Sequence, residues 1–154
     1  MALLRSAHEA VGADLTSAGG TGTYDLHSWV SEIQAGSYLL MDTHYAQLDL
    51  PFRQALFVDA VVLSVNDDSY AVADAGLKCF GMDHGDPSVL GYTVFFCSDE
   101  HVTFLWNDET KPSVGDRVRL VPGHVDPTVA CHQQMWVVRD REVVDRWDID
   151  LRNW

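Results

Sequence analysis

Two short stretches of the sequence combine residue types that suit chemistry. The first is "SAGGTGTYD" at residues 17–25, which holds three glycines and two threonines. Glycines allow backbone N–H groups to converge on an anion, and threonine hydroxyls add further donors. Loops of this kind usually follow a strand and open a helix in an α/β unit. The stretch therefore suits a phosphate group, although a flexible surface turn has the same composition.

The second stretch is "VPGHVDPTV" at residues 121–129, in which His124 and Asp126 are two positions apart. If this stretch is extended, both side chains lie on one face of a strand. An imidazole beside a carboxylate suits a divalent ion such as Zn²⁺ or Mn²⁺, with the other positions open to water or substrate. The pair alone is a weak signal, because a turn beside Pro127 with a solvated histidine would have the same sequence pattern.

Composition limits the kind of molecule that carries these stretches. The chain has 154 residues, of which 47% are hydrophobic and 21% charged, which is ordinary for a globular domain with its own core. The formal net charge of −13 argues against a nucleic-acid partner, whose phosphates would be repelled. No apolar run reaches the ~18 residues of a membrane span. The first residues lack the features of a signal peptide, so we expect a cytoplasmic protein without a membrane partner.

The elements that position the two stretches change in character along the chain. Helical spacing of apolar residues predicts a helix that starts near Leu3 and stops at Gly12. Residues 31–42 read as a strand with a Gly-Ser break. After Pro51 the pattern is almost entirely that of short strands, which predicts a sandwich or barrel. We expect these strands at residues 55–65, 69–76, 91–98, 101–106 and 116–122, followed by a hairpin around Asp140-Arg141.

Several longer motifs together carry a family resemblance. They run in order from residue 17 to residue 152 and are "SAGGTGTYD", "EIQAGSYLLMD", "DAGLKCFGMDHGDP", "SDEH", "GDRVRLVPGHVDPTV" and "VVDRWDIDLR". With these motifs the chain resembles the fold-type III pyridoxal-phosphate enzymes of the D-threonine aldolase and D-serine dehydratase-like family. Members have an N-terminal α/β barrel that carries the cofactor and a C-terminal β-domain that completes the active site.

The resemblance implies a mainly β fold, with a C-terminal β-barrel or sandwich preceded by a short α/β segment. Residues 1–48 would correspond to the last piece of the α/β barrel with its phosphate-binding loop. Residues 49–154 would correspond to the D-serine dehydratase-like C-terminal β-domain. The implied partners are a second copy of the chain or a complementing N-terminal barrel.

The resemblance also assigns roles to individual residues. The metal pair falls on His124 and Asp126, which would hold Mn²⁺, Zn²⁺ or Mg²⁺. Because the dehydratases tend to have a cysteine at the second position, the aspartate favours the aldolase branch. Residues near the phosphate of pyridoxal phosphate would be Gly20, Thr21, Gly22, Thr23, Tyr24, Ser37 and Tyr38.

The implied function is that of a lyase acting on β-hydroxy-D-amino acids, most simply the cleavage of D-threonine to glycine and acetaldehyde. D-Serine dehydratase activity, 3-hydroxy-D-aspartate aldolase activity and a non-catalytic metal-binding or partner-binding β-domain are the alternatives. The family's Schiff-base lysine belongs to the barrel, whereas Lys78 and Lys111 fall in the β-domain. No catalytic residue is therefore assigned within the chain, and we expect the chain alone to be inactive.

The remaining reactive or aromatic side chains have structural interpretations. Histidines in "MDHGDP" and "SDEH" are expected to be loop residues, and tryptophans in strands are expected to pack in a core or an interface. Cysteines without a CxxC spacing indicate neither a disulfide framework nor a structural zinc site, and are expected to be small buried hydrophobes. The residues concerned are His84, His101, Trp106, Trp136, Trp147, Cys79 and Cys131.

Overall fold

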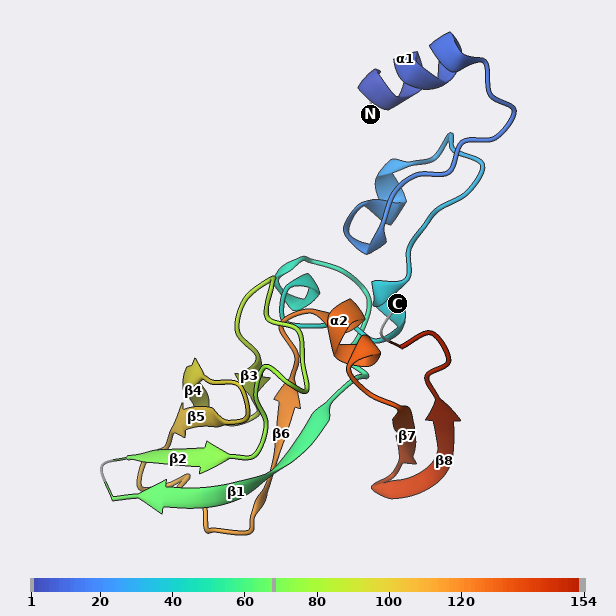
Figure 1. Cartoon of the computed structure of the whole chain (residues 1–154). Helices are drawn as coiled ribbons and strands as arrows, with labels where there is room; N and C mark the ends of the chain where they lie inside the picture. Colours follow the sequence, from blue (N-terminus) through green and yellow to red (C-terminus); the bar gives the residue numbers. More distant parts are fainter. Residues whose placement is uncertain (1, 68, 153–154) are drawn as a thin grey trace.

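The computed structural model describes residues 2–67 and 69–152 (Figure 1). Residues 1, 68, 153 and 154, which include the outer ends of the expected ranges 1–48 and 49–154, lie outside the described part. Within the described part, none of the helices has both the length and the apolar character needed to traverse a bilayer.

A six-stranded antiparallel sheet forms the centre of the molecule. Its strand order is β3-β6-β1-β2-β5-β4, and the two outer strands are joined by a short turn in which Tyr92 N–H donates to the Val89 carbonyl at 3.0 Å. The sheet is thereby nearly closed on itself, and the expectation of a mainly β fold with a barrel is confirmed. The strands are β1 (Val58–Asn66), β2 (Tyr70–Ala73), β3 (Ser88–Val89), β4 (Thr93–Cys97), β5 (Val102–Leu105) and β6 (Arg117–Val121).

The hydrophobic core lies inside this sheet. Alternate residues of β2 and β6 are buried, as expected where successive side chains of a strand point to opposite faces. Phe80, Phe104 and Leu120 are fully buried, and the Phe104 ring contacts Tyr92 with ring centroids 4.6 Å apart. Trp106 is also buried, which confirms its expected role in packing.

A short helix and a separate hairpin follow the sheet. Helix α2 (Val125–Ala130) comes directly after β6, and β7 (Gln134–Arg139) pairs with β8 (Glu142–Asp148) in a two-stranded sheet of its own. Figure 1 shows this hairpin apart from the six-stranded sheet. Asp140 and Arg141 both have positive φ, the signature of the tight turn that the sequence predicts here.

The N-terminal segment contains helical turns in place of the expected strand. Helix α1 (Ala2–Val11) ends at Gly12, whose φ of 68° gives a left-handed helix end, as expected. The expectation of a strand over residues 31–42 is wrong. Only a parallel bridge between Ser17 and Glu32 forms, because the chain turns at Gly36 into a short 3₁₀ helix and no third strand extends the ladder. The 3₁₀ helices are η1 (Thr21–Leu26), η2 (Ser37–Leu39) and η3 (Tyr45–Gln47).

Candidate functional site

Two loops approach each other closely around His124. The loop after β2 meets the end of β6 through an isolated antiparallel bridge, in which His124 N–H donates to the Gly81 carbonyl at 3.2 Å. A Cβ atom at Gly81 would collide with the Pro127 ring, and a Cβ atom at Gly123 would collide with the Gly85 carbonyl. Two glycines therefore permit the contact that brings the loop after β2 to His124.

The predicted metal pair, His124 and Asp126, comes together at the start of a helix and not along a strand. His124 is extended, with φ −144° and ψ 123°, but the helix α2 begins at the next residue. The expectation that His124 and Asp126 share one face of a strand is therefore wrong. The helix start turns Asp126 back, so that its Oδ2 lies 3.3 Å from Nε2 of His124.

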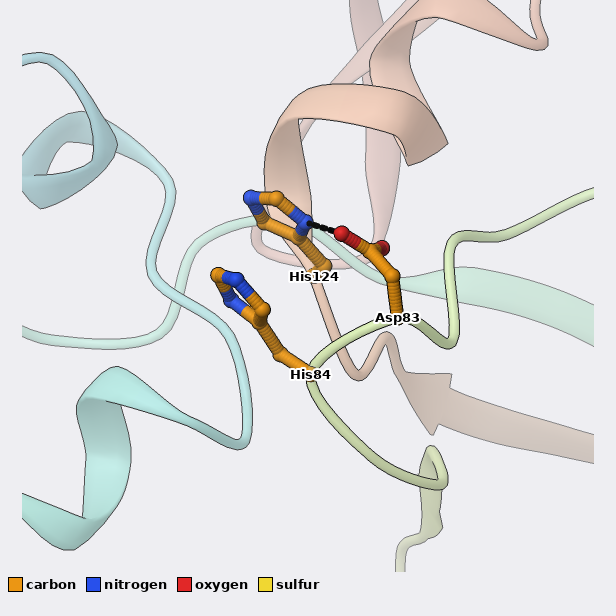
Figure 2. Close-up of side chains that lie close together, drawn as sticks. All are labelled: Asp83, His84 and His124. Carbon is orange, nitrogen blue, oxygen red and sulfur yellow. Dashed lines mark hydrogen bonds and ion pairs between the residues drawn. The ribbon is translucent and has the colours of Figure 1, made fainter.

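The other ring nitrogen of His124 faces a second carboxylate. Nδ1 of His124 lies 2.8 Å from Oδ2 of Asp83, as the dashed line in Figure 2 shows. This hydrogen bond holds the pKa of the Asp83 carboxyl below its usual value. The His84 ring stacks on the His124 ring, with centroids 3.8 Å apart and planes 15° apart, and the His44 ring lies 4.8 Å beyond His84. His124 is thus mostly buried among groups that fix its orientation.

The arrangement fits a divalent ion between His124 and Asp126. Two metal–ligand bonds of about 2.1 Å at a tetrahedral angle place their donor atoms about 3.4 Å apart. The separation of 3.3 Å between His124 Nε2 and Asp126 Oδ2 matches that requirement. The Asp126 side chain is 69% exposed, which leaves further coordination positions accessible to water or substrate. A carboxylate on the remote nitrogen of a ligating histidine is the usual supporting contact in such sites.

Part of this cluster lies outside the predicted site. Asp83 is not among the predicted ligands and His84 is expected to be a loop residue, yet both contact His124. Both residues belong to the motif "DAGLKCFGMDHGDP", so the sequence does mark this stretch. The close approach of its loop to His124, which Gly81 and Gly123 permit, becomes visible only in three dimensions.

The glycine-threonine loop lies beside the turn that carries Ser37 and Tyr38. Thr21 is buried, and its Oγ1 accepts a hydrogen bond from Tyr38 N–H at 3.0 Å. Gly20 N–H donates to Thr23 Oγ1 at 3.2 Å, which closes the loop on itself. Open space lies where a Cβ atom of Gly20 or Gly36 would stand. The backbone of both turns is therefore open to its surroundings at these two glycines.

The other residues predicted near the phosphate have different neighbours. Tyr24 and Tyr38 each contact Phe52, with ring centroids 5.2 Å apart in both pairs. Gly22 faces Leu48 instead of open space. Ser37 Oγ donates to Asp126 Oδ2 at 3.4 Å. This last contact joins the phosphate-loop region to the proposed metal pair, although the two stretches are far apart in the sequence.

The buried carboxylate of Asp42 supports the start of α2. Its Oδ2 accepts a hydrogen bond from Val125 N–H at 2.9 Å, and its Oδ1 accepts one from Tyr45 N–H at 2.8 Å. Thr43 N–H donates to the Pro122 carbonyl at 3.0 Å beside it. The N-terminal segment is thus fastened to the turn that presents His124 and Asp126.

Both lysines of the chain are engaged in ion pairs. Lys78 pairs with Glu100, which raises the pKa of the lysine and lowers that of the glutamate. Lys111 lies 3.1 Å from Asp67 and sits over the Trp106 ring. Neither lysine belongs to the cluster around His124.

Several known proteins are similar to this chain in sequence. A family model described as a putative serine dehydratase domain matches residues 55–138. The chain is 39% identical to a D-threonine aldolase of Arthrobacter sp over 92% of its length and 40% of that protein. It is 35% identical to a 3-hydroxy-D-aspartate aldolase of Paracoccus denitrificans (strain Pd 1222) over 94% of its length and 41% of that protein. The chain thus spans about 40% of the length of these relatives.

A solved structure agrees with the sequence relatives. The crystal structure of a D-threonine aldolase from Filomicrobium marinum superimposes with a TM-score of 0.83 at 32% identity, over 93% of this chain and 42% of that protein. The family model covers more than half of the chain, and the structural match extends into the N-terminal segment. The chain belongs to the family of the putative serine dehydratase domain.

Proposed function

We propose that the chain is the C-terminal part of a metal- and pyridoxal-phosphate-dependent lyase that cleaves β-hydroxy-D-amino acids, with D-threonine as the model substrate. The observation that carries the proposal is the separation of 3.3 Å between His124 Nε2 and Asp126 Oδ2. The 39% identity to a D-threonine aldolase supports the choice of reaction. In this reaction the bond between Cα and Cβ of D-threonine breaks, giving glycine and acetaldehyde.

The metal pair has a defined task in this proposal. His124 and Asp126 would hold the ion, and the Ser37 hydroxyl donates a hydrogen bond to Oδ2 of Asp126. A divalent ion supplies a Lewis acid that lowers the pKa of a bound hydroxyl. The exposed side chain of Asp126 would let the β-hydroxyl of a substrate reach the pair. Losing this assistance costs several kcal/mol, which is roughly a thousandfold in rate.

The glycine-threonine loop has the second task. Gly20, Thr21, Gly22 and Thr23 would hold the phosphate group of pyridoxal phosphate, whose pyridine ring serves as an electron sink for carbanion chemistry. Thr21 contributes by fixing the neighbouring turn through Tyr38 N–H. Tyr24 and Tyr38 both contact Phe52, and the Ser37 hydroxyl donates to Asp126, so these residues would connect the loop to the metal pair.

A chimera tests this function directly. The Arthrobacter relative is matched over only 40% of its length, so its remaining part can supply a barrel to which this chain is fused in place of the matched portion. We expect the chimera to release acetaldehyde and glycine from D-threonine in the presence of pyridoxal phosphate and Mn²⁺. Chelation with EDTA should remove most of this activity. A folded chimera that binds pyridoxal phosphate and does not cleave D-threonine would contradict the proposal.

Substitutions in the chimera test the metal pair. His124→Ala and Asp126→Ala should each reduce the rate to about the level of the EDTA-treated parent. Combining them should add little, because both residues act through one ion. Asp108→Ala removes an exposed carboxylate from the loop after β5 and serves as the matched control. If either site variant kept its full rate after EDTA treatment while the parent lost activity, the assignment would be wrong.

A second substrate is favoured by a specific feature of the cluster. The 3-hydroxy-D-aspartate aldolase of Paracoccus denitrificans is 35% identical, and a second imidazole, His84, stacks on His124 with the His44 ring on its far side. Imidazole donors suit the additional carboxylate of hydroxyaspartate. The same chimera should therefore be assayed with 3-hydroxy-D-aspartate, with glyoxylate as the product. Ammonia release from D-serine would instead identify a dehydratase.

A further inference from the structure

Three donor groups around His124 suggest a different ion site at first sight. One ligand atom from each of Asp83, His84 and His124 lies within 4.8 Å of the others. An ion bound by this trio would have to use Nδ1 of His124, since Asp83 lies on that side of the ring. The pair of His124 and Asp126 would instead use Nε2. The two arrangements therefore use different nitrogens of the His124 ring, and they require different orientations of the neighbouring side chains.

The orientation of the two rings decides between these arrangements. The lone pair of an imidazole nitrogen lies in the plane of its ring. The planes of His84 and His124 are 15° apart and their centroids are separated by 3.8 Å, so the rings lie one over the other (Figure 2). A single ion cannot lie in both planes at once. His84 is therefore placed to cover His124 and not to share an ion with it.

The backbone fixes the partner of Nδ1. Gly81 N–H donates to Thr128 Oγ1 at 2.9 Å, and Thr128 Oγ1 donates to the His124 carbonyl at 2.6 Å. Together with the bridge between Gly81 and His124, these bonds lock the loop that carries Asp83 against the start of α2. The bond between Asp83 and His124 is therefore set by the backbone, although the Asp83 side chain is 60% exposed.

We propose that Asp83 and His84 are positioning residues for His124. Asp83 accepts a hydrogen bond from Nδ1–H of His124. The single proton of the neutral ring is thereby kept on Nδ1, and Nε2 is left without a proton and directed toward Asp126. The His84 ring stacks on the His124 ring and prevents the His124 ring from rotating out of its observed orientation. The inference rests on the proposed function only for the identity of the bound ion; the tautomer and the ring orientation belong to the chain itself.

The tautomer of His124 is measurable without any ion. Ring ¹⁵N chemical shifts of the 154-residue chain, recorded at mildly alkaline pH, distinguish a protonated Nδ1 from a protonated Nε2. We expect His124 in the parent to carry its proton on Nδ1, and Asp83→Ala to move the population toward Nε2. Asp83→Asn, which keeps an oxygen acceptor, should restore part of the parental signal, and Asp108→Ala should change nothing. A parent protonated on Nε2, or a tautomer unaffected by Asp83→Ala, would overturn the inference.

Ion affinity tests the two residues separately. Titration calorimetry of the chain with Zn²⁺ or Mn²⁺ should show about 10- to 100-fold weaker binding for Asp83→Ala. His84→Phe keeps a flat ring for stacking and removes both nitrogens, so it should bind the ion about as well as the parent, whereas His84→Ala should bind more weakly. If His84 were a ligand, His84→Phe would lose as much affinity as His84→Ala, and the proposal would be wrong.

The outcomes separate this inference from the proposed function. If the parent chain and the chimera both bind no divalent ion, the metal part of the proposed function fails, while the tautomer measurement still decides the role of Asp83. If an ion binds independently of Asp126 but requires Asp83 and both nitrogens of His84, the trio is the ion site and the positioning roles are refuted. Binding that depends on Asp126 and His124, and is tuned by Asp83, supports both.

Discussion

The three cysteines occupy different environments, which makes them reporters of the local structure. Cys79 and Cys97 are half-buried, and burial raises the pKa of the Cys79 thiol and raises that of Cys97 to about 12. Cys131 is exposed at the end of α2, so the expectation that it is a buried hydrophobe is wrong. The helix α2 ends there on the surface, outside the core of the six-stranded sheet.

We therefore expect one fast thiol per chain with a disulfide reagent at mildly alkaline pH. A thiol with a pKa of about 12 has a thiolate fraction of about 10⁻⁴ near pH 8, and the thiolate is the reactive form. Cys131→Ser should abolish the fast phase, whereas Cys97→Ser should leave it unchanged. Raising the pH should accelerate Cys97, because the thiolate fraction grows as pH approaches its pKa. Equal rates for all three thiols would contradict this assignment.

At the scale of elements, sequence patterns predicted the strands of the sheet but not the contacts between loops. Strands β2, β4, β5 and β6 and the final hairpin lie where alternation and turn residues place them. The helical start at Val125 was missed, because "HVDPTV" contains β-formers as well as a proline suited to the first turn of a helix. The contacts made by Asp42 and Asp83 were also missed. Val125, which Asp42 contacts, and His124, which Asp83 contacts, are more than 40 residues away from these aspartates, and single-sequence periodicity reports only on local neighbours.

Asp42 offers a test of how the N-terminal segment supports α2. Asp42→Ala leaves the buried N–H group of Val125 and the part-buried N–H group of Tyr45 without their acceptor, so we expect a loss of about 3 kcal/mol in the free energy of unfolding. Urea denaturation followed by tryptophan fluorescence measures it. Asp42→Asn keeps one oxygen acceptor and should lose less.

Asp49→Ala is the matched control for this substitution, because Asp49 is an exposed aspartate close by in the sequence. It should leave the urea midpoint near that of the parent. If Asp42→Ala also left the midpoint unchanged, the carboxylate would not be holding α2. A shared loss in both variants would point to a general effect of charge.

Among the exposed apolar side chains of the described residues, which include Phe95 on β4, those of the N-terminal segment and of the β7–β8 hairpin bear on assembly. In the N-terminal segment, Leu39 is 63% exposed and Ile33 is 38% exposed, whereas Leu40 is half-buried. In the hairpin, Trp136 and Trp147 are 62% and 54% exposed, so the expected core packing of these two residues is not observed within the chain. An interface with another protein remains the prediction for both tryptophans.

The pairing of the hairpin strengthens this prediction. Trp136 lies opposite Arg146 and Trp147 lies opposite Met135, so the two tryptophans project from opposite faces of the two-stranded sheet. A two-stranded hairpin is marginally stable in water, and apolar residues on both faces indicate that each face is covered in the working assembly. We predict that the cover is either a second copy of the chain or the barrel of the proposed lyase.

We expect the isolated chain to self-associate through these surfaces. Light scattering should report an average mass that rises above 17.2 kDa with concentration. Replacing Trp136 and Trp147 by serine should lower that mass if the hairpin forms the contact, and replacing Ile33 and Leu39 by serine should lower it if the N-terminal segment does. Phe95→Ser removes an equally exposed aromatic ring from β4 and should have little effect. Association is expected because large exposed apolar surfaces on both faces of a hairpin favour burial against a like surface. A parent chain that stays monomeric at every concentration would refute it.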